Sequence, residues 1–325
     1  MHYRTLGRTG LPASEIGYGA WGISGSGWIG AQDQESLQAL QRAIDLGVNF
    51  IDTALAYGEG HSERLIGQVL RNNLDKQIIV ATKIPPKNGR WPAPAGVPVE
   101  EAFPGPHIQE CTEQSLRNLG TQTLDLQQFH VWNDEWVGQG DWLETIQRLK
   151  EQGKIRFFGV SINDLQPDNA LRLIETGLVD TVQVIYNIFE QSPEDTLFPA
   201  CHQHHIGVIV RVALDEGGLT GMVTPESRFD PQDFRSNYFR GNRKQEVYER
   251  VQNMVSDLGT TVDELPEIAL RYVLSHPVVS TVIPGMRSVR NVERNIAISD
   301  GRTLLPGQLQ KLTTHRWVRD FYKRV

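Results

Sequence analysis

The sequence predicts a (β/α)8 barrel. Eight short runs rich in β-branched residues recur along the 325 residues, and amphipathic stretches separate them. Alternation of strands with helices is typical of βα units around a parallel sheet. No GxGxxG motif follows the first run, which disfavours a doubly wound dinucleotide-binding sheet. Eight units in succession therefore favour one barrel domain over residues 1–325, a size that such barrels reach.

The expected strands leave room for a helix after each of them. The spacing of Leu37, Leu40 and Ile44, for example, puts three apolar side chains on one helical stripe. The expected strands are residues 16–20, 48–53, 78–83, 124–130, 157–161, 182–186, 208–212 and 281–283.

Three further segments extend this plan. Residues 3–11, with a turn from Gly7 to Gly10, predict a β-hairpin that plugs the barrel floor. Residues 85–106 are rich in Pro and Gly, and residues 222–241 are polar and rich in turn formers. Both are expected to be long loops that follow strands, and such loops form the active face of a barrel.

Composition and charge exclude several classes of protein. With 39% apolar and 22% charged residues the chain is ordinary for a globular fold, and its net charge of -7 argues against a nucleic-acid partner. No apolar run resembles a secretory signal or approaches the roughly 20 residues of a membrane span. Cys111 and Cys201 fall in different expected helices, which fits a reducing compartment. We expect a cytoplasmic protein, monomeric or weakly oligomeric, that acts on a small molecule.

Ionisable side chains stand at the ends of three successive expected strands. Asp52 closes the second strand, Tyr57 follows in its loop, Lys83 ends the third strand and His130 ends the fourth. Taken singly, Asp52 is explained as a helix cap, Lys83 as a solvated cation and His130 as a core histidine. Together they fall where barrel enzymes carry catalytic groups, and a buried Lys or Asp needs a partner. We therefore expect them to form one catalytic group.

This group suits the reduction of a carbonyl, in which hydride reaches carbon and a proton must reach oxygen. Tyr57 is the natural proton donor. Lowering the pKa of a phenol from about 10 to about 7 takes about 4 kcal/mol, much of which the Lys83 ammonium can supply. Asp52 would keep Lys83 charged, and His130 would orient the carbonyl oxygen or share the proton.

The segments around these four residues resemble the aldo-keto reductase family. FIDTALAYG at residues 50–58 is similar to the family signature around its Asp and Tyr, and ERLIG at 63–67 continues it. ATK at 81–83 and LQQFH at 126–130 are similar to the Lys and His segments of the family. The resemblance runs nearly end to end. It implies NADP(H) bound in extended form across the barrel mouth.

The resemblance also implies residues that contact the cofactor. Residues 159–163 resemble the segment that holds the carboxamide of the nicotinamide, although in the family the Asn directly follows the Ser. Gln183 is implied as a second ligand, and its alternative role is that of a hydrogen-bonded amide in the core. Residues 215–221 resemble the pyrophosphate loop, and residues 283–295 resemble the adenosine-phosphate site. Some members carry a Lys where this chain has Gly285. The implied contacts are Ser161, Gln183 and either Asn163 or Asp164 for the carboxamide, Leu214, Gly217 and Leu219 for the pyrophosphate, Arg287 and Ser288 for the 2′-phosphate, Asn291 and Asn295 for the adenine, and Gly285 in the same adenosine-phosphate segment.

Arg211 departs from the family pattern at the end of the seventh strand, where many members place an aromatic residue against the nicotinamide. A guanidinium can also stack on a ring. Its charge would then disfavour the oxidised, positively charged ring relative to the reduced one. Contact with substrate oxygens is the alternative role for Arg211.

Tryptophans fall in or beside the expected loops after strands one, three and four, and we expect them to ring the pocket mouth. About half should contact substrate, since aromatic residues more often pack in cores. Trp21 and Trp132 are the leading candidates, and Asn133, Asp134 and Glu135 add polar groups suited to a sugar, a polyol or a small aldehyde. The full set is Trp21, Trp28, Trp91, Trp132 and Trp136.

Two other functions remain open from the sequence. Some members of the resembled family are regulatory subunits that bind cofactor and turn over substrate slowly, although the presence of all four catalytic residues favours an enzyme. A metal-dependent barrel isomerase is the other alternative, but the strand ends lack a carboxylate cluster. His202, His204 and His205 fall at the end of an expected surface helix, and we predict no metal site.

Overall fold

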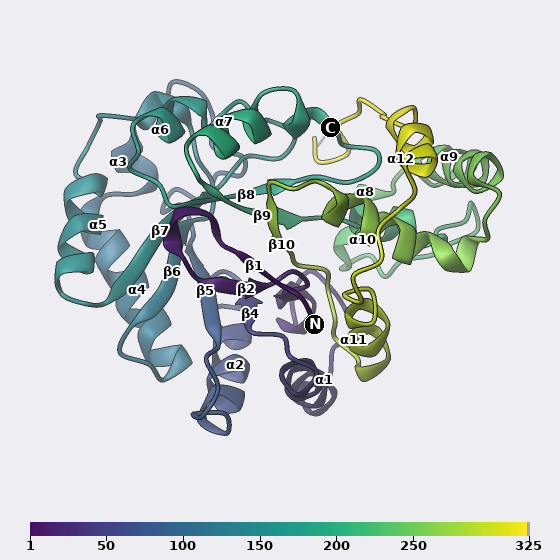
Figure 1. Cartoon of the computed structure of the whole chain (residues 1–325). Helices are drawn as coiled ribbons and strands as arrows, with labels where there is room; N and C mark the ends of the chain where they lie inside the picture. Colours follow the sequence, from purple (N-terminus) through teal and green to yellow (C-terminus); the bar gives the residue numbers. More distant parts are fainter. Residues whose placement is uncertain (324–325) are drawn as a thin grey trace.

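A closed barrel of parallel strands forms the centre of the molecule. The computed structural model describes residues 1–323, so Arg324 and Val325, the end of the expected barrel range, lie outside the described residues. Within residues 1–323 an eight-stranded sheet has the order β10-β9-β8-β7-β6-β5-β4-β3. Parallel bridges from Ile16 to Val282 and from Gly19 to Gly285 join the first strand to the last. The sheet therefore closes into a (β/α)8 barrel, with helices around its outside (Figure 1).

The elements follow one another as alternating strands and helices. The strands are β1 (Tyr3–Thr5), β2 (Pro12–Ser14), β3 (Tyr18–Gly19), β4 (Phe50–Asp52), β5 (Ile79–Ile84), β6 (Leu124–Phe129), β7 (Ile155–Ser161), β8 (Thr181–Ile185), β9 (Gly207–Arg211) and β10 (Val279–Val282). The helices are α1 (Asp33–Asp45), α2 (His61–Arg71), α3 (Val99–Ala102), α4 (Gly105–Leu119), α5 (Trp142–Glu151), α6 (Leu171–Glu175), α7 (Leu197–Gln203), α8 (Phe234–Tyr238), α9 (Arg243–Leu258), α10 (Leu265–Ser275), α11 (Val289–Ile296) and α12 (Pro306–Thr313).

Each of the eight expected barrel strands is confirmed, with ends that differ by a few residues. Every side chain of β4, β5 and β8 is buried, because barrel strands face the interior on one side and the helices on the other. Residues 85–106 and 222–241 are only partly irregular. The first segment contains α3 and the start of α4, and the second contains α8.

The N-terminal hairpin covers the barrel floor, as the sequence predicts. β1 pairs antiparallel with β2, which lies beyond the expected end of the hairpin, and a short 3-10 helix (Gly7–Thr9) makes the turn. Leu6 and Ala13 are buried in one cluster with Phe50 and Ile209 of the barrel strands. Gly7 has a φ of 50°, and a Cβ there would stand 2.1 Å from the Gly207 amide nitrogen. Only glycine lets the hairpin approach β9 this closely. Figure 1 shows the hairpin in purple across the barrel.

The helices bury one stripe each against the sheet. On α2 the buried apolar residues are Leu65, Ile66 and Val69, the spacing expected of an amphipathic helix. Gly120 caps α4 after Leu119, and its φ of 68° allows its amide to bond to carbonyls of the last turn. Cys111 on α4 and Cys201 on α7 are both free and buried. Among residues 1–323, none of the helices combines the length and the apolar character needed to cross a bilayer.

Candidate active site

The carboxyl ends of β4, β5 and β6 bring the four expected catalytic residues to one rim of the barrel. Asp52 is the last residue of β4, and Tyr57 lies in the turn before α2. Lys83 stands near the end of β5, in register with Gln128 of β6. His130 directly follows β6. Because neighbouring parallel strands end on the same face, residues far apart in the sequence become neighbours here.

Asp52 and Lys83 form a buried ion pair beneath this rim. Lys83 Nζ donates to Asp52 Oδ2 and to the Thr53 carbonyl, each at 2.7 Å, and the two charged side chains are 0% and 3% exposed. The other Asp52 oxygen accepts from Gln183 Nε2 at 2.7 Å and from Gln128 at 3.5 Å. Burial lowers the pKa of Lys83, and the Asp52 carboxylate acts in the opposite direction. The pair is thus held by the hydrogen bonds that a buried charge requires.

Tyr57 and His130 face each other above the ion pair. Their ring centroids lie 5.6 Å apart at 73°, and Lys83 Nζ lies 5.1 Å from the Tyr57 centroid. The pKa of Tyr57 is raised by burial and then by the Asp52 charge, which together outweigh the opposite effect of Arg211. The sequence predicts a lowered pKa for this phenol, so that prediction is wrong for this state of the protein. Burial and the charges of Lys83 and Arg211 hold the pKa of His130 well below its usual range, so the imidazole is neutral.

Aromatic rings surround this group on the open side. Trp21 stacks on Tyr57 with centroids 6.1 Å apart, and Trp28 meets Trp21 edge-on at 5.8 Å. Trp91, from the segment after β5, lies edge-on to His130 at 4.5 Å and is 48% exposed. These three rings are the aromatic wall of the site.

Trp132 and Trp136 do not belong to this wall, and the expectation that Trp132 contacts substrate is wrong. Trp132 is 0% exposed and packs against Phe129, Trp136 and Trp142. Its indole N–H donates to Asp134 at 3.0 Å. A tryptophan ring can be buried completely when its N–H reaches a hydrogen-bond partner inside the protein, as the Trp132 N–H reaches Asp134.

The expected carboxamide contacts fall into two groups. Ser161 ends β7 in register with Gln183, and the Gln183 amide is already committed to Asp52, which fits its alternative as a core amide. Asn163 instead fixes the segment after β5, because its side chain accepts from the Ala93 amide and donates to the Ala93 carbonyl, each at 3.0 Å. In this conformation Asn163 is a structural residue, which corrects the expectation that it holds the cofactor.

Arg211 ends β9 beside the catalytic group. Its guanidinium donates to Asp164 Oδ1 at 2.8 Å and to the Ile162 carbonyl at 2.9 Å. Among residues 1–323, its buried Nε has no hydrogen-bond partner. The charge of Arg211 is therefore balanced by Asp164, while one of its donors is left for another group.

Several polar groups of the loop after β9 already have hydrogen-bond partners within the protein. It contains the 3-10 helix η5 (Asp215–Thr220), and the amides of Gly217 and Leu219 both donate to the Leu214 carbonyl. These two amides are not free for a pyrophosphate in this conformation, contrary to expectation. Glu216 accepts from the Tyr322 hydroxyl at 2.8 Å, so its carboxylate is turned toward the C-terminal segment.

The segment before α11 presents groups suited to an adenosine phosphate. Arg287 Nη1 donates to the Ile29 carbonyl at 2.8 Å, and Ser288 caps α11 by accepting from the Asn291 amide. Asn291 is exposed, whereas Asn295 is buried. An arginine at a helix N-terminus is a chemically suitable donor set for a phosphate.

Open space near these donors also fits a dinucleotide. A Cβ placed on Gly217 or Gly285 would meet no atom of the described residues within 4 Å. Gly285 is exposed beside Arg287. The donor set and this space are compatible with NADP(H) along the rim.

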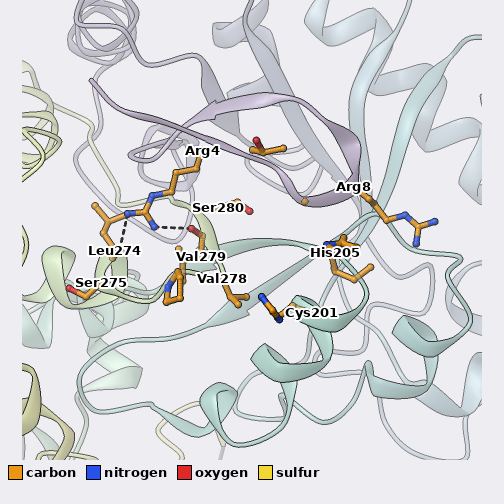
Figure 2. A pocket seen from close by; sticks show the side chains of 14 residues that line it. Arg4, Arg8, Cys201, His205, Leu274, Ser275, Val278, Val279 and Ser280 are labelled. Carbon is orange, nitrogen blue, oxygen red and sulfur yellow. Dashed lines mark hydrogen bonds between the residues drawn. The ribbon is translucent and has the colours of Figure 1, made fainter.

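A groove at the other end of the barrel lacks this chemistry. It has a volume of about 790 Å³ and lies between the hairpin, α7 and α10. Figure 2 shows Arg4 donating to the backbone of Leu274 and Val279, whereas Arg8 points away from the cavity. None of the expected site residues lines this groove. Across residues 1–323, no three His, Cys, Asp or Glu side chains gather as a metal site.

The sequence interpretation missed several residues near the site. Trp91 was expected at the pocket mouth as one of five tryptophans but had no signal that singled it out. Tyr322 was missed, since it lies in a C-terminal segment to which no role was given. The aromatic and basic spacing of Trp317, Arg319 and Phe321 was the available signal. Arg319 pairs with Asp215 and lies over the Trp317 ring at 4.4 Å, which ties this segment to the loop after β9.

Comparison with known proteins identifies the family. The sequence model of the Aldo/keto reductase family matches residues 15–316. The aldo-keto reductase YhdN of Bacillus subtilis is 31% identical over 300 residues, which cover 90% of this chain and 87% of that protein. The NADH-specific methylglyoxal reductase of Escherichia coli is 26% identical over 303 residues, covering 90% and 91%.

Solved structures of aldo-keto reductases have the same fold as this chain. Aldo-keto reductase AKR11C1 from Bacillus halodurans, in its holo form, superposes with a TM-score of 0.77 at 25% identity, over 99% of this chain and 100% of that one. The glycerol dehydrogenase AKR11B4 from Gluconobacter oxydans also gives 0.77, at 27% identity, over 96% and 94%. A barrel with these strand ends, matched over nearly all of its length, thus belongs to the aldo/keto reductase family of carbonyl-reducing oxidoreductases.

Proposed function

We propose that this protein is an NADPH-dependent reductase that converts aldehydes or ketones, keto sugars among them, to alcohols, with Tyr57 as the proton donor. The observation that carries the proposal is the Tyr57 phenol between Lys83, whose Nζ is 5.1 Å from its ring centroid, and the His130 ring at 5.6 Å. A reduced nicotinamide supplies hydride to the carbonyl carbon when bound. The residues of this chain must then deliver a proton to the carbonyl oxygen.

Tyr57 is suited to donate that proton. Its raised pKa keeps the phenol protonated until negative charge develops on the substrate oxygen. The buried Lys83 ammonium, held by Asp52, then stabilises the phenolate that remains, because the two charges interact in a site of low polarity.

His130 is suited to orient the carbonyl. Its imidazole is neutral, and its Nδ1 is buried without a partner among the described residues. Buried N–H groups without a partner are rarer in proteins than under-satisfied acceptors, so Nδ1 is assigned as the unprotonated ring nitrogen. The proton therefore resides on Nε2, from which it can be donated to a substrate oxygen.

The cofactor preference rests on Arg287 and Ser288 at the start of α11. An arginine beside a helix N-terminus favours the 2′-phosphate that distinguishes NADPH from NADH. Ser161 and Arg211 remain the proposed residues at the nicotinamide end, together with the side-chain oxygen of Gln183, whose amide nitrogen bonds to Asp52. Trp21, Trp28 and Trp91 would hold the apolar face of the substrate.

The test is a panel of simple aldehydes, 2-keto sugars and 3-keto sugars, with NADPH oxidation followed by absorbance. Wild-type protein should reduce members of the panel, and Tyr57→Phe should lower kcat by roughly 10²–10⁴. NADPH binding to Tyr57→Phe, measured by fluorescence, should stay near the wild-type value. Undiminished turnover in Tyr57→Phe would refute the mechanism.

A further inference from the structure

The backbone after β9 contains residues in an unfavourable conformation. Val212, Asp215 and Glu216 have φ values of 58°, 52° and 53°, although none of them is glycine. Each such residue costs on the order of 1–2 kcal/mol, so the conformation persists only where the surrounding structure holds it. The strained turn carries the Glu216 side chain into the protein, where it is 8% exposed.

Side chains of the C-terminal segment and of α8 hold this turn in place. The Tyr322 hydroxyl donates to Glu216 Oε1 at 2.8 Å. The neighbouring Asp215 accepts from the Tyr238 hydroxyl at 3.0 Å and pairs with Arg319. Asp215 therefore pairs directly with a cation, whereas the hydrogen-bond partner of Glu216 among residues 1–323 is a neutral phenol.

Two ion pairs lie at the catalytic group. Lys83 pairs with Asp52 at 2.7 Å, and Arg211 pairs with Asp164 at 2.8 Å. Glu216 adds one negative charge to these two neutral pairs whenever it is ionised. Its charge acts on both Tyr57 and Arg211. The charge therefore acts at the position where the proposed proton donor meets the substrate carbonyl.

Opposing groups leave this carboxyl poised near neutrality. Burial and the charges of Asp215 and Asp164 raise the pKa of Glu216 to about 7. The Tyr322 hydrogen bond and the Arg211 charge act in the other direction. The charge of Glu216 also acts on Tyr57 and Tyr238, which are both neutral phenols with raised pKa.

We propose that the Glu216 carboxylate sets the relative affinity of this site for the oxidised and reduced forms of the cofactor. The inference rests on the proposed function, because it requires a nicotinamide beside Tyr57. Hydride and proton reach adjacent atoms of one carbonyl, so the nicotinamide must lie within a few ångströms of the phenol. The two cofactor forms differ in charge only at that ring. An additional negative charge therefore favours the positively charged, oxidised form.

The experiment measures the dissociation constants of NADP+ and NADPH by tryptophan fluorescence, in wild type and in Glu216→Gln. The ratio of the two constants, NADP+ over NADPH, should be about tenfold higher in Glu216→Gln than in wild type above neutral pH. In wild type the ratio should fall as pH rises through about 7, and in Glu216→Gln it should be flat. Titration of the 2′-phosphate cancels, because both cofactor forms carry it.

Two further variants sharpen the test. Glu226→Gln removes the same charge from an exposed position of the same loop and should leave the ratio unchanged. Tyr322→Phe removes the hydrogen bond to Glu216, so the pH at which the ratio changes should move upward, with the wild-type ratio regained at high pH. Tyr322→Phe also tests the proposal if Glu216→Gln does not fold.

The outcomes are distinguishable. Equal changes in both dissociation constants for Glu216→Gln, or a wild-type ratio that is independent of pH, would overturn the inference while the proposed function stands. Failure of the wild-type protein to bind either cofactor would overturn the proposed function and this inference with it.

Discussion

Lys83 Nζ lies 2.7 Å from Asp52 Oδ2 at the bottom of the barrel mouth, although 31 residues separate the two along the chain. Both side chains are buried, so neither charge has water as an alternative partner. Everything proposed for Tyr57 depends on this pair, because the ammonium beneath its ring must remain charged and fixed.

Asp52→Asn should therefore destabilise the protein as well as inactivate it. The substitution leaves the Lys83 ammonium buried without a counter-ion, which costs about 3–5 kcal/mol of unfolding free energy. Chemical denaturation measures the loss. Asp33→Asn is the matched control, because it removes an exposed carboxylate that pairs with His61, and it should cost less than about 1 kcal/mol. Equal losses for the two variants would contradict the assignment.

Trp132→Ala should mainly lower stability, whereas Trp91→Ala should mainly change the kinetics. The Trp132 ring fills a closed aromatic cluster, so its truncation should lower the unfolding free energy by about 3–5 kcal/mol. The Trp91 ring is half exposed beside His130, so its truncation should raise KM by roughly 5- to 10-fold and change stability little. Steady-state kinetics and denaturation curves check both. An unchanged KM in Trp91→Ala would remove this ring from the substrate site.

Glu216 should make the cofactor-free protein less stable at alkaline pH. Its pKa rises from the ordinary 4.5 to about 7 on folding, so the folded state favours the protonated carboxyl. The stability that this preference contributes is complete below pH 4.5 and is lost as pH rises through about 7. Relative to wild type, Glu216→Gln should gain as much as ~3 kcal/mol between these limits. Urea denaturation at acid and alkaline pH, with Glu226→Gln as control, measures the difference, and a constant offset would contradict it.

Arg287→Ala should weaken NADPH binding far more than NADH binding. A lost arginine–phosphate interaction costs about 1.5–3 kcal/mol, so the NADPH dissociation constant should rise roughly 10- to 150-fold. NADH has no 2′-phosphate, so its affinity should fall only by what the loss of the hydrogen bond between Arg287 and the Ile29 carbonyl costs. Fluorescence titration with both cofactors gives the comparison. Arg290→Ala, at an exposed position of α11, is the control, and parallel losses for both cofactors would exclude Arg287 from the phosphate site.

Much of the fold could be predicted from the sequence because its signals are local. A β-branched run such as residues 124–129 is recognisable by itself, and the alternation of such runs with amphipathic stretches specifies a parallel barrel. Once the barrel is assumed, residues at successive strand ends must share a rim. That rule predicts that Asp52, Tyr57, Lys83 and His130 lie together.

The sequence by itself thus determined the barrel, its floor hairpin and the four residues at its mouth. Tertiary structure alone decided which tryptophan faces the site, since Trp91 and Trp132 both follow barrel strands and differ only in what packs on them. It also decided that Asn163 binds Ala93, and that Tyr322 reaches Glu216 across 106 residues. Strand and helix signals act over a few residues, whereas side-chain burial and pairing depend on long-range packing that local periodicity does not encode.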